Sequence, residues 1–384
     1  MINHVTTPSA GDAETWLEGR QAAMIGLLAD LVAIDSPSRD RAGVDAVGAR
    51  IAAFLASEGI ETRTERDTPH GKILSAETGE GAPFLLLGHR DTVFPAGEAA
   101  RRPFREAAGR AYGPGVADMK AGLVMNAFAL AALHRHFPAI SCRMLTTVDE
   151  EIGSPFSREA IETAARASRA VFNSEPARAS GNIVSGRKGG VTYHLTVTGR
   201  AAHAGVNFTE GRSAIHALAR KIVRLAALTR AEEGVTVNVG TVHGGSTFNT
   251  VAESAVAEID TRFVTHGQRD ELKAAIAEIA EAGEGEGISA CLRERSEFYP
   301  LVADAASEAM ARAYLDAAKA QGIEIGAEFT GGCADSGFTA SVGTPTLCGV
   351  GPVGGKAHTV DEYIEVQSLL ERTKVLVAAM QALA

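Results

Sequence analysis

The first residues that could do chemistry are His89-Arg90-Asp91, which directly follow the apolar run Phe84–Leu87. Such a run is typical of a buried central strand. In a strand, residues i and i+2 face the same side, so Asp91 is placed to accept a hydrogen bond from the His89 ring. That bond would fix the tautomer of the ring and strengthen it as a metal ligand. A polar pair on the surface is the alternative interpretation of this motif taken alone.

Carboxylates follow the next two predicted strands. Asp149-Glu150-Glu151 ends the strand at 143–147, and Glu175 follows the strand at 170–172. Mutual repulsion makes such a group of acids costly unless solvent or cations relieve it. A solvated loop would do this, but a metal site needs oxygen donors of the same kind. Of two adjacent glutamates, one could bind a metal while the other faces a metal-bound water as general base.

Two glycine-rich loops carry the remaining candidates. Asp118 follows Gly113-Pro114-Gly115 just before a predicted helix, where an aspartate is ordinarily an N-cap, and His358 follows Gly354-Gly355. The carboxyl ends of parallel strands share one edge of a sheet, so we expect these groups to meet there. The candidate ligands are two histidines and three carboxylates: His89, Asp118, Glu151, Glu175 and His358. This set, without cysteine, suits a pair of borderline divalent cations such as zinc.

The composition excludes several other classes of protein. The chain has 384 residues, with 37 Lys and Arg against 47 Asp and Glu, and its net charge is −10. A nucleic-acid-binding protein would need a basic face. The four cysteines are far apart and show no CxxC spacing, which argues against a disulfide scaffold or a cysteine zinc site. We find no apolar run of roughly 18 residues and no signal peptide, so we expect a cytoplasmic protein that binds neither nucleic acid nor membrane.

The hydrophobic pattern predicts two domains, one inserted into the other. Residues 15–34 have the periodicity of a single amphipathic helix, and helices alternate with buried strands up to about residue 185. The order then becomes strand, helix, two strands, helix, strand, which is typical of a ferredoxin-like α+β domain. We therefore expect an α/β domain with a central mixed sheet from residues 1–185 and 298–384, and an inserted domain from residues 186–297.

Six segments of the chain resemble signatures of one enzyme family. This is the family of zinc exopeptidases and deacylases that includes acetylornithine deacetylase, succinyl-diaminopimelate desuccinylase and carboxypeptidase G (glutamate carboxypeptidase), the last being the most similar. The segments are LLLGHRDTVFPAG, AYGPGVADMKAG, TTVDEEIGS, NSEP, TGRAAHAG and AHTVDEY. The resemblance implies a zinc-exopeptidase (phosphorylase/hydrolase-like) fold for the outer domain. It implies a lid and dimerisation role for the inserted one.

The resemblance also implies two bound metal ions. The expected metal is zinc, with cobalt or manganese as alternatives because these ligands tolerate all three. His89 and Glu175 would hold one ion, and Glu151 and His358 the other. Asp118 would bridge them.

Further roles follow from the same resemblance. Asp91 would orient His89, and Glu150 would be the general base and then the general acid toward the leaving amine. The peptide bond after the bridging aspartate is often cis in this family. His203, in the inserted domain, would reach the active site of the partner subunit in a homodimer and stabilise the oxyanion. A histidine in a turn at a strand end is the alternative interpretation.

Substrate contacts are also implied in the inserted domain and in a glycine-rich loop. Arg262 would bind the substrate carboxylate, because a planar guanidinium suits such a group. Asn249 would bind the carbonyl region, and domain closure would bring both residues over the metal ions. Gly331-Gly332 resembles the start of the family's substrate loop. The next residue, Cys333, departs from the family pattern, and we interpret it as a packed residue rather than a nucleophile.

These expectations combine into a hydrolase that cleaves an amide bond and releases a C-terminal amino acid, of glutamate type. Its substrate would be a small N-acyl or peptidyl amino acid. One alternative is an N-acyl amino acid deacylase of the acetylornithine or succinyl-diaminopimelate type, because the metal site would be shared. An inactive metal-binding interaction protein is a further alternative. The presence of Glu150 and of all five candidate ligands argues against it.

Overall fold

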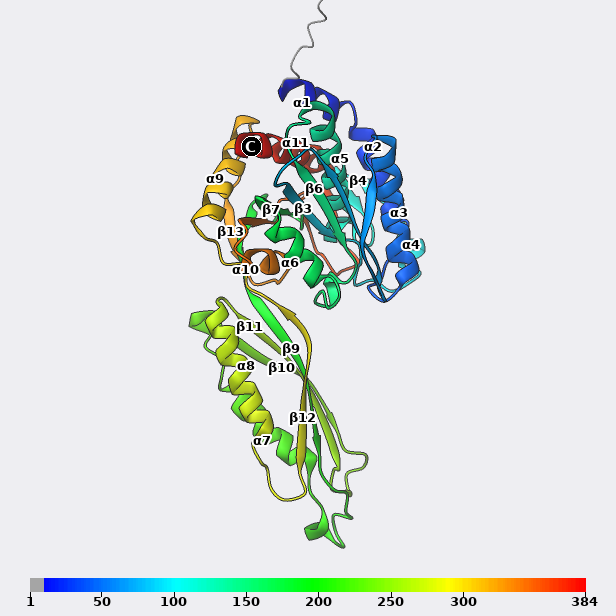
Figure 1. Ribbon diagram of the computed structural model, residues 1–384. Coiled ribbons are helices and arrows are strands. Elements are labelled where there is room, and N and C mark those ends of the chain that lie inside the picture. The colour runs from blue at the N-terminus through cyan, green and yellow to red at the C-terminus, as the bar shows by residue number, and fades with distance from the viewer. Residues whose placement is uncertain (1–9) are drawn as a thin grey trace, which may run out of the picture. The chain divides into compact units, whose positions relative to one another are not determined.

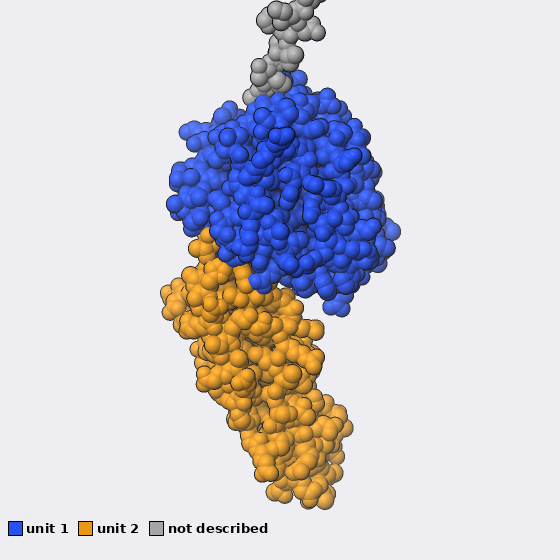
Figure 2. Space-filling view, viewed as in Figure 1, with its two compact units in different colours: residues 1–186, 303–330, 334–384 blue, residues 187–302, 331–333 orange. Residues whose placement is uncertain are grey.

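The structure is a computed structural model that describes residues 10–384. These residues form two compact units, which Figure 2 shows in separate colours. The first unit comprises the chain up to Gly186 together with Ala303–Thr330 and Ala334–Ala384. The second comprises Arg187–Val302 together with Gly331–Cys333. Residues 1–9, which begin the segment in which no signal peptide is expected, lie outside the described residues.

The second unit is larger than the insert expected at residues 186–297, and it includes a distant tripeptide. Arg187 donates hydrogen bonds from Nη1 to the main-chain oxygens of Gly332 and Cys333, at 3.2 and 3.5 Å. Arg262 donates from Nη1 to the Sγ atom of Cys333 at 2.7 Å. These contacts join residues that are at least 71 positions apart, so the local pattern of the sequence could not reveal them.

An eight-stranded mixed sheet forms the centre of the first unit (Figure 1), in the order β1-β2-β6-β3-β7-β14-β8-β13. Strand β3 pairs in parallel with β6 on one side and with β7 on the other, so the carboxyl ends of these three strands share one edge. Strand β3 is buried at every residue, as its apolar run predicted. The strands are β1 Thr62–Thr68, β2 Gly71–Thr78, β3 Phe84–His89, β6 Cys142–Thr147, β7 Ala170–Asn173, β8 Ile183–Arg187, β13 Ala327–Thr330 and β14 Thr346–Cys348.

A small antiparallel sheet, which the sequence pattern did not predict, joins distant segments of the first unit. Its order is β15-β16-β5-β4, and Tyr363 of β16 pairs with Tyr112 of β5. The pairing places the glycine-rich loop that follows β5 beside the loop that precedes β16. The strands are β4 Arg105–Ala107, β5 Arg110–Tyr112, β15 Gly354–Gly355 and β16 Tyr363–Glu365.

Helices cover both faces of the large sheet (Figure 1). Helix α5 is buried along its whole length up to Leu133 and packs against β3 and β6, and α11 packs on α5 and α9. The helices are α1 Ala10–Glu18, α2 Gln21–Val32, α3 Arg41–Ser57, α4 Glu98–Arg101, α5 Ala121–His136, α6 Arg158–Arg166, α9 Ala305–Ala320, α10 Ser336–Ser341 and α11 Val366–Leu383.

One sequence expectation about the helices is wrong. The single helix at 15–34 is two helices, α1 and α2, because Gly19-Arg20 interrupts the pattern and Arg20 has non-helical backbone angles. Among residues 10–384, one helical segment, Val116–His136, is long and apolar enough by length and composition to cross a membrane. Its polar residues Asp118, Lys120 and Asn126 interrupt it, so it is not the unbroken apolar run whose absence was expected. It is almost wholly buried in the unit, as the core helix of a soluble protein also can be.

The second unit has a four-stranded antiparallel sheet in the order β10-β11-β9-β12. With one helix after the first strand and one after the third, this is the ferredoxin-like arrangement that the element order predicted. One face of β9 is buried against the helices through Val191, Tyr193, Leu195 and Val197. The elements are β9 Gly189–Thr198, α7 Ala214–Ala226, β10 Thr236–Gly244, β11 Ser254–Phe263, α8 His266–Glu281 and β12 Ser289–Phe298.

Candidate metal centre

The carboxyl-end edge of the large sheet positions the first group of candidate residues. His89 is the last residue of β3, and Glu150 and Glu151 lie in a short helical turn just after β6. Glu175 lies two residues after β7. Because β3 pairs in parallel with both neighbours, all four side chains start from the same edge. The structure therefore brings together what the strand-end pattern predicted.

One ring nitrogen of His89 is surrounded by carboxylates. The Nε2 atom lies 3.1 Å from Oδ1 of Asp118 and 3.7 Å from Oε1 of Glu175. It lies 4.0 Å from Oε2 of Glu150. The His89 side chain is only 1% exposed, so these contacts are made away from bulk water. An imidazole with several carboxylate oxygens at this range is a typical donor set for a divalent cation.

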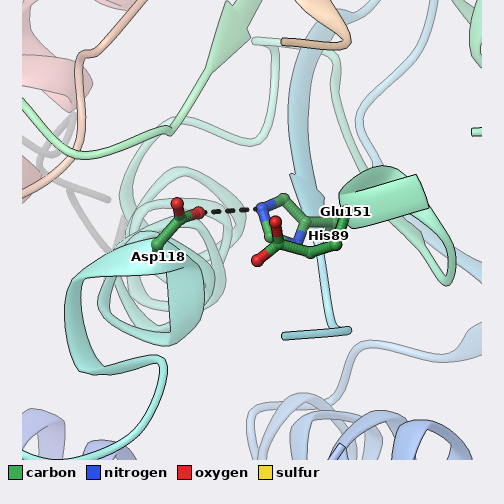
Figure 3. Close-up of side chains that lie close together, drawn as sticks. All are labelled: His89, Asp118 and Glu151. Atoms are coloured by element: carbon green, nitrogen blue, oxygen red, sulfur yellow. Dashed lines mark hydrogen bonds and ion pairs between the residues drawn. The ribbon is translucent and has the colours of Figure 1, made fainter. Parts of the chain in front are cut away.

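The second oxygen of Asp118 faces the other candidate histidine. Its Oδ2 atom lies 3.2 Å from Nε2 of His358, which also lies 3.3 Å from Oε2 of Glu151. The two oxygens of one carboxylate therefore point to two different histidines, as a bridging ligand requires. Figure 3 shows Asp118 with His89 and Glu151, whose ligand atoms all lie within 4.8 Å of one another.

A buried carboxylate oxygen of Glu151 gives further support for a bound metal. The Oε1 atom of Glu151 is buried and has no hydrogen-bond partner among the described residues. A buried carboxylate oxygen left without a partner is costly, and a cation would satisfy it. The interpretation of Asp118 as a helix N-cap is wrong, because its side chain caps no helix and turns toward the two histidines instead.

Asp91 lies behind His89, on the side away from the other carboxylates. Nδ1 of His89 is 3.0 Å from the main-chain oxygen of Asp91 and 3.4 Å from its Oδ1. The Asp91 carboxylate also accepts hydrogen bonds from Ser38 Oγ at 2.7 Å and from the N–H groups of Glu150 and Glu151, at 3.2 and 3.1 Å. The strand ends at His89, so this contact comes from the turn and not from the alternation of a strand.

The pKa values of the cluster reflect its burial and its excess of acid. Burial raises the pKa of Glu150 well above its usual value, and it raises the pKa of Glu151 to about 7 against the hydrogen bond with His358. Hydrogen bonds to Asp118 and Glu151 raise the pKa of His358 to about 10. Burial acts to raise the pKa of Asp91, but the interactions with the His89 ring are stronger, so the pKa is lowered. Several carboxylates therefore lie close together with few positive charges nearby. A bound dication would offset the repulsion between them.

A buried glutamate that sequence reasoning missed holds the loop of Asp118. Oε2 of Glu362 accepts a hydrogen bond from the N–H of Gly115 at 2.9 Å. Its Oε1 accepts from the N–H groups of Ala117 and Asp118, at 2.8 and 2.9 Å. The signal in the sequence was weak, because a glutamate next to an aspartate in a loop is usually solvated. The peptide bond between Asp118 and Met119 is cis, as the resemblance implied.

The remaining candidates belong to the second unit, where His203 and Asn249 lie on neighbouring segments. The N–H of Ala204 donates to the main-chain oxygen of Asn249 at 2.9 Å, and His203 pairs with Thr250 in an isolated bridge. His203 is exposed, and its Nδ1 accepts a hydrogen bond from the N–H of Gly205 at 3.1 Å. The turn that carries His203 is therefore ordered by its backbone, while the ring stays open to solvent.

Arg262 and the loop Gly331-Gly332-Cys333 form a second group in this unit. Arg262 donates from Nε and Nη2 to the two carboxylate oxygens of Asp260, at 3.0 and 2.8 Å, and from Nη1 to Cys333 Sγ. Sequence reasoning missed Asp260 as the residue that orients the guanidinium. Burial raises the pKa of the Cys333 thiol, which agrees with a packed residue rather than a nucleophile.

A model of peptidase family M20/M25/M40 matches residues 85–382. The chain belongs to this family, and it is therefore a metallopeptidase or amidohydrolase. Carboxypeptidase G2 from Pseudomonas sp. (strain RS-16) is 28% identical over 371 residues, which cover 92% of this chain and 87% of that protein. A succinyl-diaminopimelate desuccinylase from Leptothrix cholodnii is 28% identical over 380 residues, which cover 90% of this chain and 94% of that protein. The predicted family is confirmed.

Solved structures show the same fold. An M20 family metallo-carboxypeptidase from Sulfolobus solfataricus has a TM-score of 0.76 at 19% identity, covering 93% of this chain and 98% of that chain. A dinuclear metal-binding peptidase of the M20 family from Bacillus subtilis has a TM-score of 0.67 at 16% identity, covering 95% and 99%. The predicted α/β fold with a central mixed sheet is thus confirmed.

Proposed function

We propose that this protein is a di-zinc hydrolase that cleaves an amide bond and releases a C-terminal amino acid of glutamate type. The observation that carries the proposal is the buried cluster in which the two oxygens of Asp118 face His89 and His358. The similarity to carboxypeptidase G2 over most of the chain supports the type of substrate. The similarity to a dinuclear metal-binding peptidase supports the number of metal ions.

Each ion would have its own ligands. His89 and Glu175 would hold one cation, and Glu151 and His358 the other, with Asp118 between them. When bound, the cations would make a water molecule more acidic and polarise the substrate carbonyl. Zinc suits these nitrogen and oxygen donors, and cobalt or manganese would also be accepted.

The surrounding residues would orient the ligands and move the proton. Asp91 holds the His89 ring through Nδ1, so that the opposite nitrogen, Nε2, faces Asp118 and the proposed metal position. Glu150 is farther from His89 Nε2 than Asp118 and Glu175 are, with its Oε2 atom 4.0 Å away, and it is not needed as a ligand. It would take the proton of the attacking water and then give it to the departing amine.

Residues of the second unit would recognise the substrate. Arg262 would bind the substrate carboxylate, since Asp260 holds its guanidinium in a defined orientation. Asn249, Gly331 and Gly332 would contact the rest of the substrate, and His203 of a second copy would stabilise the oxyanion. The exposed position of His203 is compatible with a role toward another copy of the chain.

A homodimer formed through the second unit is part of this proposal. Large apolar side chains of this unit are exposed, among them Val206, Phe208, Val223 and Phe248. Strand β10 is also an edge strand of its sheet. Exposed apolar groups and free strand edges are typical of protein–protein contacts. Light scattering should give twice the mass of the chain, and a monomer at all concentrations would contradict this part.

A cytoplasmic location completes the proposal. The four cysteines, all within the described residues, are free thiols, as a reducing compartment would keep them. Cell fractionation of the native host should recover the protein with cytoplasmic markers. Recovery with membranes or outside the cell would contradict this location.

The alternative is an N-acyl amino acid deacylase, which the desuccinylase relative favours because it is as similar as the carboxypeptidase. A panel of N-acyl-glutamates, dipeptides with C-terminal glutamate, acetylornithine and succinyl-diaminopimelate separates the two. We expect turnover of the first two groups by the zinc-loaded protein and none after chelation. Activity confined to the last two substrates would establish the deacylase, and activity that survives chelation would overturn both.

A further inference from the structure

The carboxylate of Glu362 is buried near the cluster and faces main-chain N–H groups rather than candidate ligands. Its side chain has no exposed surface. It receives three N–H groups from the four residues Gly115 to Asp118. Successive N–H groups that converge on one anion form a concave site of fixed geometry. Hydrogen bonds to an ionised carboxylate are also stronger than bonds between neutral groups.

This carboxylate connects the two loops that carry Asp118 and His358. One of its three donors is the N–H of Asp118 itself, so Glu362 acts directly on the backbone of the residue that faces both histidines. Glu362 also lies four residues after His358 in the same loop. The N–H of Glu362 donates to the main-chain oxygen of Thr359, next to His358, at 3.3 Å.

Exposed contacts hold other points of the loop of His358: Lys356 pairs with Asp361 at 3.2 Å, and Arg102 donates to the main-chain oxygen of Val360 at 3.1 Å. Glu362 is the buried attachment of this loop.

The His358 side chain is 52% exposed, and its backbone has a positive φ of 63°. Its Nε2 atom nevertheless lies within 3.3 Å of both Asp118 and Glu151. A side chain this open needs an anchor elsewhere in its loop if the spacing is to persist in solution. The buried end of Glu362 supplies that anchor.

We propose that Glu362 is a positioning residue that sets the spacing between Asp118 and His358 and so prepares both metal positions before metal binds. This role rests on the proposed di-metal function. It differs from a purely structural role, which would affect the stability of the fold but not the affinity of the folded protein for metal. Residues that support metal ligands from behind typically change metal affinity about 10- to 100-fold when they are replaced.

The test is the zinc affinity of Glu362→Gln, measured by competition with a chromophoric chelator on protein whose fold is checked by circular dichroism. Glutamine keeps the length but offers one acceptor oxygen, so its amide N–H₂ must face at least one N–H of the loop. The matched control is Asp361→Asn, because Asp361 is the exposed neighbour and pairs with Lys356 at the surface, 3.2 Å away. We expect about 10- to 100-fold weaker binding of both zinc ions by Glu362→Gln and unchanged binding by the control.

The outcomes separate this role from the function on which it rests. A wild-type protein that binds fewer than two zinc ions would overturn the di-metal function and this role with it. Two tightly bound ions in the wild type and equal affinity in folded Glu362→Gln would overturn the positioning role alone. If Glu362→Gln does not fold, Glu362→Asp carries the same test, because it keeps the charge but is too short to reach all three N–H groups.

Discussion

The two groups of functional candidates in this protein are built in opposite ways. In the first unit, His89, Asp91 and Glu362 are buried almost completely, and each is held by several hydrogen bonds. In the second unit, His203 and Asn249 are exposed, and their segments are joined by a main-chain hydrogen bond between Ala204 and Asn249. Under the proposed function, buried hydrogen bonds would preorganise the chemistry in the first unit, while recognition would use the exposed His203 and Asn249 and the partly exposed Arg262, which Asp260 orients. Replacing a preorganised group should therefore reduce activity more than replacing an exposed one.

The largest effect should come from removing metal. Chelation is expected to reduce hydrolysis to background, because the first unit would lose both cations, and added zinc should restore it. The measurement is the rate of hydrolysis of an N-acyl-glutamate before chelation, after it and after zinc is returned. The unfolding temperature should fall as well, because ligands that bind only the folded state stabilise it. Full activity in a protein shown by metal analysis to hold no zinc, cobalt or manganese would contradict the proposed metal dependence.

The next largest effect is expected for Glu150→Gln. Loss of a general base and acid should lower kcat by about 10²- to 10⁴-fold, with little change in zinc content. Steady-state kinetics together with metal analysis of the purified variant would measure both quantities. The control is Glu159→Gln on α6, whose exposed carboxylate pairs with Arg66 and lies outside the cluster. A variant of Glu150 with wild-type kcat would exclude it as the base.

Arg262→Ala should show the contrasting behaviour of the second unit. Loss of its charge-assisted hydrogen bonds to the substrate carboxylate should raise KM about 10- to 100-fold, since such bonds contribute about 1.5–3 kcal/mol. The zinc affinity should not change. Arg230→Ala is the matched control, because Arg230 also pairs with carboxylates in this unit, those of Glu233 and Glu271. Unchanged KM, or loss of zinc, would break the proposed division between the two units.

The smallest effect concerns the support beneath His89. Arg90 is fully buried and donates hydrogen bonds to the main-chain oxygens of Val44 and Lys72. A Cβ atom on Gly48 would overlap with Nη1 of Arg90. Gly48→Ala should therefore lower the free energy of unfolding by about 1–3 kcal/mol, as overpacking does.

Gly26→Ala tests whether this cost comes from Arg90 or from the glycine change itself. Gly26 lies in α2, and a Cβ atom there would meet nothing within 4 Å. This variant should be neutral or more stable by about 0.5–1 kcal/mol, because alanine favours a helix. Urea unfolding of both variants provides the measurement. Equal stability of the two would show that the packing around Arg90 is not tight.

The sequence could predict those parts of the site that depend on the local order of apolar and polar residues. The apolar run that ends at His89 indicates a buried strand, and acids after two more strands indicate the same sheet edge. The helix predicted at 15–34 failed for a local reason as well, because one glycine is a weak sign of a break inside an otherwise helical period. Short strands such as β5 and β15 carry too few residues for any period to be visible.

The sequence by itself determined the types of the candidate ligands, the positions of His89, Glu151 and Glu175 at strand ends and the order of elements in the second unit. Only the tertiary structure decided that the two oxygens of Asp118 reach two different histidines, that Glu362 holds the loop of Asp118, and that Cys333 belongs with Arg262. Glu362 and Gly115 are 247 residues apart in the chain. Contacts over such separations depend on how the sheets bring the loops together. The periodic alternation of apolar and polar side chains reports only on local structure and does not reveal them.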